Sequence, residues 1–195
     1  VENRTHVIPR TFDQICSVLS ELNYIDGENI APEGEMLSII YSEFDLLVSE
    51  SIRQKIWNEL TPAELASVLS AIIFQARNDD EAKMKTPKGT ILEATKSMER
   101  IWFAIHTLES KNRLDTMRQI DTGLTWATYR WASGATLSEV LENTDLTAGD
   151  FVRQMKQLLD LLTQISALSN PLSFAASEAT KLLKRGVIAY SNQVA

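Results

Sequence analysis

Residues 148–168 form the most strongly patterned stretch of the chain, and they limit the folds that it can adopt. The segment reads AGDFVRQMKQLLDLLTQISAL. Thr147 is placed to cap a helix, and Asp150 lies three residues later, near the positive end of the helix dipole. Apolar side chains then recur at the spacing of a helix with one core-facing side: Phe151, Met155, Leu158, Leu162 and Ile165. We therefore expect a long helix whose apolar side packs against other elements.

The opposite side of this helix carries long polar side chains rather than the usual mixture of Glu and Lys. Four of them lie within roughly 40° of one line along the helix, with Lys156 nearby: Arg153, Gln157, Asp160 and Gln164. An ordinary solvated surface is one interpretation of this row. The other is a helix laid along a polar ligand such as a single strand of nucleic acid.

The rest of the chain predicts an all-α protein. Periodicity and capping residues indicate about nine helices with mostly short connections, which is typical of a helical bundle. The helix that begins with Thr61 and Pro62 is apolar over much of its circumference, so we expect it at the centre. The other expected helices are 11–22, 36–41, 45–60, 90–110, 121–133, 137–143, 148–168 and 173–190.

The start of the chain differs from the bundle. Two very short strands around a turn at 24–32 predict a tiny β-hairpin, and a helix followed by a hairpin resembles the end of a winged-helix-like region. We divide the chain into residues 1–33 (linker, helix and short hairpin) and residues 34–195 (helical bundle). Thr11 is expected to cap the first helix, and the polar stretch 78–89 predicts an exposed loop.

The sequence lacks the motifs of a self-contained active site. It contains no G-x-x-x-x-G-K-[ST] phosphate loop, no H-E-x-x-H and no G-x-S-x-G. His6 and His106 are far apart and have no cysteine pair to complete a zinc site. Cys16 and the four tryptophans lie on apolar helical patterns and are expected in the core. We therefore expect neither catalytic residues nor a metal site in this chain.

The charge of the chain argues against a free-standing nucleic-acid binder. Its formal net charge is −7, whereas phosphate neutralisation by a basic surface supplies most of the affinity of such proteins. Any contact with a strand has to be local, weak or assisted by other parts of a larger protein. The single Cys16 and the absence of a long apolar segment favour a cytoplasmic location without membrane contact.

Several spaced motifs resemble a known family. They include WASGATL at 131–137, TDLTAGDFVR at 144–153 and KQLLDLLTQI at 156–165, with shorter matches at 24–26, 60–65, 74–77 and 184–188. These segments resemble the C-terminal helical (DSHCT) domain of DExH-box helicases of the superkiller and exosome type. The resemblance covers about residues 20–195 and is greatest to the bacterial helY-like members found in actinobacteria.

The resemblance implies a role in strand translocation. In that family two RecA-like motor domains hydrolyse ATP, a winged helix follows, and the helical domain closes over the strand with one long ratchet helix facing the bases. The resemblance places this helix on 148–168 and matches Arg153 and Lys156 to family positions directly. Gln157 stands where the family has an Arg near the bases, which removes a charge and a stacking plane, and Asp160 matches an acidic position. With Gln164, these residues are the expected nucleic-acid contacts.

The sequence thus predicts a non-catalytic C-terminal accessory domain of an ATP-dependent helicase, which guides a single strand of RNA or DNA past the motor domains. Its expected partners are the strand and the RecA-like motor and winged-helix domains of the same polypeptide; ATP and Mg are expected only in that parent motor. The alternative is a protein-interaction bundle without direct nucleic-acid contact, which the acidic charge favours. A helix-turn-helix that reads duplex DNA is the weaker interpretation, because Asp150 would face phosphate at the start of the recognition helix.

Overall fold

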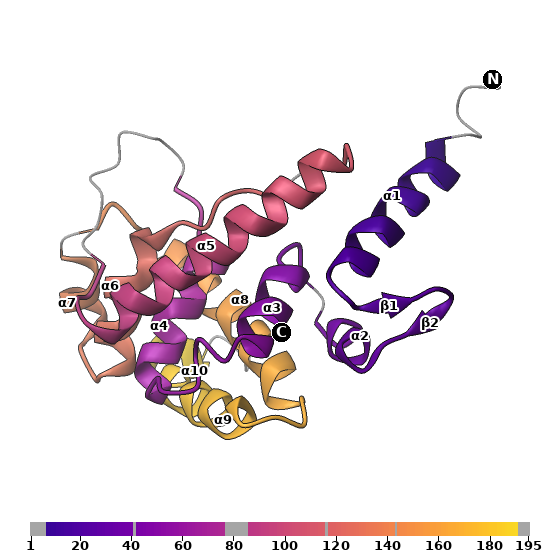
Figure 1. Cartoon of the computed structure of the whole chain (residues 1–195). Coiled ribbons are helices and arrows are strands. Elements are labelled where there is room, and N and C mark those ends of the chain that lie inside the picture. Colours follow the sequence, from indigo (N-terminus) through magenta and orange to yellow (C-terminus); the bar gives the residue numbers. More distant parts are fainter. Residues whose placement is uncertain (1–6, 41, 77–85, 116, 143, 191–195) are drawn as a thin grey trace.

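The computed structural model describes residues 7–40, 42–76, 86–115, 117–142 and 144–190. These ranges form ten α-helices, one short 3-10 helix and a two-stranded antiparallel hairpin, which confirms the predicted all-α class (Figure 1). None of the described helices is both long and apolar enough to cross a membrane. In chain order the elements are α1 (Val7–Glu21), β1 (Ile25–Asp26), β2 (Asn29–Ile30), α2 (Pro32–Leu37), α3 (Asp45–Arg53), α4 (Pro62–Ile73), α5 (Thr90–Lys111), η2 (Thr122–Leu124), α6 (Thr125–Ala132), α7 (Leu137–Leu141), α8 (Ala148–Ser166), α9 (Leu172–Leu183) and α10 (Gly186–Tyr190).

Helix α4 lies at the centre of the bundle, as its sequence predicts. The Thr61 hydroxyl accepts from the Glu64 amide, and the Glu64 carboxylate accepts from the Thr61 amide at 2.8 Å, so both partners of a capping box are present. Residues 65–72 are all buried. The helix contacts α5, α6, α8 and α9, so four helices share it as a packing partner.

Helix α8 packs along α9 and α4 through the predicted apolar stripe. The hydroxyl of Thr147 accepts from the Asp150 amide at 3.1 Å and donates to the Asp150 carboxylate at 2.9 Å, which confirms the predicted cap. All five stripe residues have no measurable solvent exposure: Phe151, Met155, Leu158, Leu162 and Ile165. The apolar side of α8 is therefore fixed, and its polar side is left to the surface.

Helix α1 differs from its prediction. It begins at Val7, so Thr11 lies inside the helix and does not cap it. Helical spacing predicts an apolar face of Phe12, Ile15, Val18, Leu19 and Leu22, but only Val18 is buried, whereas Phe12 is 64% and Ile15 is 43% exposed. The reason is position: α1 stands beside the hairpin at the edge of the molecule and not within the bundle (Figure 1).

A polar cluster joins the hairpin region to α3. The buried hydroxyl of Tyr24 donates to the Glu50 carboxylate at 2.8 Å, and burial together with this carboxylate raises the pKa of Tyr24. Arg53 pairs with Glu50 at 2.7 Å and donates to the Leu22 carbonyl at 3.0 Å. The division of the chain after residue 33 stays a prediction.

Three other helix limits also differ from the sequence-based expectation. Helix α2 begins earlier than residue 36, because Pro32 occupies its first turn. The helix expected at 45–60 ends at Arg53, since Lys55 adopts a left-handed conformation with φ 58°. The helix expected at 173–190 is divided into α9 and α10, where Gly186 has φ 49°. Residues 78–85 of the loop expected at 78–89 lie outside the described residues.

The burial of several side chains also differs from the sequence-based expectation. The pattern of the helix expected at 173–190 predicts Leu182 in the core and Arg185 outside, but Leu182 is 38% exposed. Arg185 is partly buried 3.7 Å above the Trp131 ring and donates to the Ala135 carbonyl at 2.6 Å. Among the tryptophans, Trp131 and Trp57 are buried as predicted, Trp102 is partly buried and Trp126 is exposed; Cys16 is only partly buried.

Candidate nucleic-acid interface

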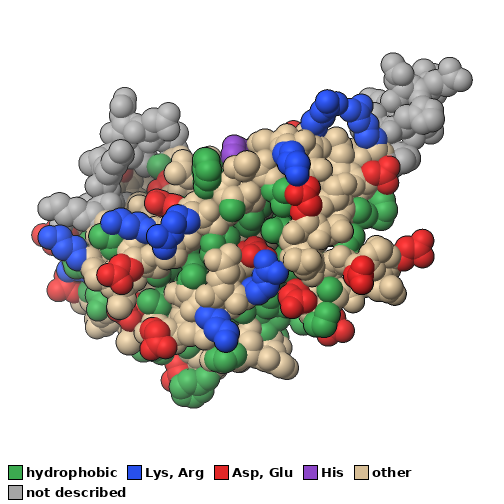
Figure 2. Space-filling model, in the orientation of Figure 1, with side chains coloured by type: hydrophobic (Ala, Val, Ile, Leu, Met, Phe, Trp, Pro, Cys, Tyr) green, Lys and Arg blue, Asp and Glu red, His purple; other side chains and the backbone are tan. Residues whose placement is uncertain are grey.

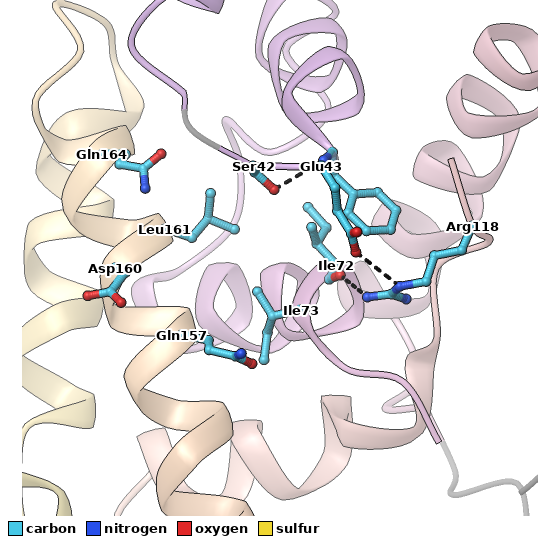
Figure 3. A pocket seen from close by; sticks show the side chains of 10 residues that line it. Ser42, Glu43, Ile72, Ile73, Arg118, Gln157, Asp160, Leu161 and Gln164 are labelled. Atoms are coloured by element: carbon cyan, nitrogen blue, oxygen red, sulfur yellow. Dashed lines mark hydrogen bonds and ion pairs between the residues drawn. The ribbon is translucent and has the colours of Figure 1, made fainter. Parts of the chain in front are cut away.

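Three residues of the predicted polar row line a hollow beside α8 (Figure 3). The hollow has a volume of about 270 Å³ and is open to solvent. Helix α8 contributes one wall through Gln157, Asp160, Leu161 and Gln164. The other walls come from the segment before α3, the end of α4 and the segment between α5 and η2: Ser42, Glu43, Phe44, Ile72, Ile73 and Arg118.

The α8 wall presents unused hydrogen-bonding groups. Gln157 and Asp160 are exposed, and Gln164 is partly buried one turn further along. Neither Gln157 nor Asp160 forms a hydrogen bond or ion pair with any residue of the described ranges. An amide offers both donors and an acceptor, whereas an ionised carboxylate only accepts. The wall can therefore bind a polar ligand without first breaking contacts of these two side chains within the described structure.

The other two residues of the predicted set lie outside the lining of the hollow. Arg153 pairs with Asp150 at 2.8 Å in the first turn of α8, and its side chain is 58% exposed. Lys156 is partly buried. The structure thus gathers Gln157, Asp160 and Gln164 at the hollow and places the two cations nearer the start of the helix.

Arg118 builds the opposite wall. Its guanidinium donates to the carbonyls of Ile72 at 2.8 Å and Phe74 at 3.0 Å, which lie at the C-terminal end of α4. It also pairs with Glu43 at 3.3 Å and lies 4.7 Å from the centre of the Phe44 ring. Carbonyls at a helix C-terminus lack partners within the helix, so a guanidinium with several donors is well suited to this place.

The charges around the hollow do not suit a bare phosphate. The carboxylates of Glu43 and Asp160 both line it, and the one guanidinium of the lining, Arg118, is engaged with carbonyls and with Glu43.

A second hollow, of about 420 Å³, shares Glu43 and Arg118 with the first and also includes Glu109. Burial raises the pKa of Glu109, although the Met117 amide donates a hydrogen bond to its carboxylate. Acidic and basic side chains are also interspersed on the face shown in Figure 2.

The residues of the opposite wall were missed by the sequence analysis. Ser42, Glu43 and Arg118 lie outside periodic helical segments, and Glu43 and Arg118 are 75 positions apart in sequence. No local pattern signals that they meet in this wall of the hollow. Among the described residues, no three His, Cys, Asp or Glu side chains come together in a way that could hold a metal ion.

Comparison with known proteins gives the chain a family. The model of the DSHCT (NUC185) domain matches residues 27–191. The probable helicase HelY of Mycobacterium leprae is 36% identical over 204 aligned residues, which cover 95% of this chain and 22% of HelY. The ATP-dependent RNA helicase mtr4 of Schizosaccharomyces pombe is 28% identical over 153 residues, which cover 76% of this chain and 14% of that protein. The chain therefore spans only about a fifth of the length of HelY, and it belongs to the DSHCT domain family of DExH-box helicases.

Proposed function

We propose that this chain is an accessory domain of an ATP-dependent helicase and guides a translocating single strand of RNA or DNA along α8. Its relatives are named as helicases, and the chain spans 22% of HelY, so most of such a protein lies outside the region compared here. The RecA-like motor, the winged helix, ATP and Mg would belong to that remaining part. The parent protein would act in the cytoplasm.

The observation that carries this proposal is the hollow beside α8. Gln157 and Gln164 are seven residues apart, which is roughly 10 Å along a helix and comparable to about three nucleotides of a stacked strand. Over that length the polar side chains of α8 that line the hollow are Gln157 and Asp160, which are exposed, and Gln164, which is partly buried. Such a row can contact successive bases of a strand that passes along the hollow.

Arg153 and Lys156 would add contacts to phosphates at the start of the row. Arg153 is exposed, and its guanidinium forms an ion pair with the Asp150 carboxylate. Each phosphate that is neutralised on a single strand steepens the salt dependence of binding by about 0.7 in log–log slope. With two such cations and a net charge of −7, the domain alone should bind weakly. Weak contact is consistent with a strand that has to slide.

A protein-interaction bundle is the second candidate, and one observation favours it. Several large apolar side chains are exposed, including Phe174 at 74% and Phe103 at 65%. Exposed aromatic side chains are enriched in protein interfaces. Under this alternative the hollow beside α8 would be an ordinary solvated surface.

The experiment that separates the two candidates is a titration of the 195-residue chain with single-stranded oligonucleotides, followed by NMR. The side-chain amides of Gln157 and Gln164 report directly from the hollow. We expect saturable shifts of these signals, and we expect Gln157→Ala to weaken binding while leaving the melting temperature unchanged. The amide signals of Gln14 in α1 and Gln54 after α3, which do not line the hollow, serve as internal controls. Absence of any shift at Gln157 and Gln164, at saturating oligonucleotide, would favour the protein-interaction candidate.

A further inference from the structure

We infer that the hollow beside α8 receives an unstacked nucleobase and favours bases with an exocyclic amino group over uracil. This inference rests on the proposed function and adds to it the kind of base edge that the site accepts. Two observations support it: the kinds of hydrogen-bonding groups that line the hollow, and the partners that some of these groups already have within the chain.

The groups left for a ligand are rich in acceptors. Asp160 presents a carboxylate that has no partner among the described residues, and Glu43 presents a second one, which is 70% exposed and pairs with Arg118 through one oxygen at 3.3 Å. The donors of Arg118 are directed largely at carbonyl oxygens of the backbone and at Glu43. The amide of Gln157 can donate or accept and therefore does not discriminate by itself.

A base is better suited to this hollow than a phosphate is. Two carboxylates repel phosphate oxygens, so the strand should place its backbone away from Asp160 and Glu43. Leu161, Ile72 and Ile73 form apolar parts of the lining, against which the flat face of a base can pack. Sequence-selective contacts to single strands use bases that have left the stack, with hydrogen bonds to their edges.

The edge of the base then decides how well it fits. Cytosine, adenine and guanine carry amino groups that donate to a carboxylate, and Asp and Glu are the usual acceptors for the cytosine amino group. Uracil has a carbonyl where cytosine has this amino group. A carbonyl facing Asp160 would bring two acceptors together and leave both without a donor.

The test compares short homo-oligonucleotides of cytidine and of uridine, whose bases have the same ring size and differ at the amino-bearing edge. Dissociation constants are measured from the Gln157 and Gln164 amide signals of the 195-residue chain. We expect oligo(C) to bind about fivefold or more tightly than oligo(U). The deoxycytidine and deoxyuridine pair should show the same ratio, because a contact to the ribose 2′-hydroxyl would change both dissociation constants alike.

Asp160→Asn isolates the group responsible. An amide can donate to the uracil carbonyl as well as accept from an amino group, so the ratio of the two dissociation constants should fall toward one. Glu99→Gln removes the same charge from an exposed position on α5, outside the hollow, and should keep the wild-type ratio.

The outcomes are distinguishable. Equal affinity of the wild type for oligo(C) and oligo(U), with clear shifts at Gln157, would overturn this inference and leave the proposed function standing. A preference that persists undiminished in Asp160→Asn would also overturn it. No shift at Gln157 with either oligonucleotide would remove the proposed function and the inference together.

Discussion

At the scale of single residues, Arg118 holds together three segments around the hollow. It satisfies two carbonyls at the end of α4, pairs with Glu43 and lies against the ring of Phe44. Loss of the guanidinium would leave those carbonyls with fewer partners in a partly buried place. Arg118 is thus part of the frame of the site, and Gln157 and Asp160 are the groups free to bind.

We predict that Arg118→Met lowers the free energy of unfolding by about 1.5–3 kcal/mol, the usual worth of hydrogen bonds to a charged group. Arg118→Lys should restore only part of this loss, because an ammonium cannot present the planar fork that reaches several carbonyls. Denaturant unfolding of the three proteins measures both effects. Full stability in the lysine variant would show that charge alone, and not the fork, matters here.

The buried stripe of α8 gives a second prediction at this scale. Met155 and Leu162 are fully buried, so either change to alanine should cost about 2–5 kcal/mol in stability through lost packing and a cavity. Gln157→Ala on the opposite side of the same helix should change stability by less than about 0.5 kcal/mol. Thermal or denaturant melts test the contrast, and a loss below about 0.5 kcal/mol at both buried sites would contradict the packing described.

At the scale of elements, one carboxylate connects the starts of two helices. Glu64 closes the capping box of α4 and also accepts from the hydroxyl of Thr90, the first residue of α5. Burial acts to raise the pKa of Glu64, but hydrogen bonds from Thr90 and Thr61 outweigh it and lower the pKa below its usual 4.5. A lowered pKa in the folded state means that Glu64 stabilises the fold above pH 4.5. This contribution is lost as the pH falls through the lowered pKa.

We therefore predict a weaker acid sensitivity in Glu64→Gln. The amide keeps a capping oxygen but does not titrate, so the loss of stability between about pH 7 and pH 3 should be smaller than in the wild type. Glu99→Gln, which replaces an exposed carboxylate outside the capping box, serves as the control. The measurement is the melting temperature across this pH range. If the melting temperatures of Glu64→Gln and the wild type changed identically with pH, the hydrogen bonds to Glu64 would not contribute to the pH dependence of stability.

At the scale of the whole molecule, the features that the sequence predicts are those set by near neighbours in the chain. The cap at Thr147 and the start of α4 at Thr61 and Pro62 both depend on residues within one helical turn. The packing of Arg185 on Trp131 joins residues 54 positions apart, so it depends on a contact across the fold. Helical periodicity contains no information about such contacts.

The same limit applies to the site. Periodicity places Gln157, Asp160 and Gln164 on one side of α8, and these three line the hollow. It does not say how far along α8 the end of α4 lies, so the predicted nucleic-acid contacts also include Arg153 and Lys156, which lie outside the lining. The wall of Glu43 and Arg118 is formed by residues distant in sequence, and only the fold brings them together.

The central claim is the proposed guidance of a strand past the motor domains, and unwinding per ATP consumed by the proposed full-length parent helicase tests it most directly. In the double variant Gln157→Ala and Asp160→Ala, both changes lie at exposed positions, so folding should be unaffected. We predict that unwinding slows more than ATP turnover does, because these side chains would contact the strand and not the nucleotide. The ratio should therefore fall below that of the wild type and of the Glu99→Ala control. An unchanged ratio in a correctly folded double variant would contradict the account.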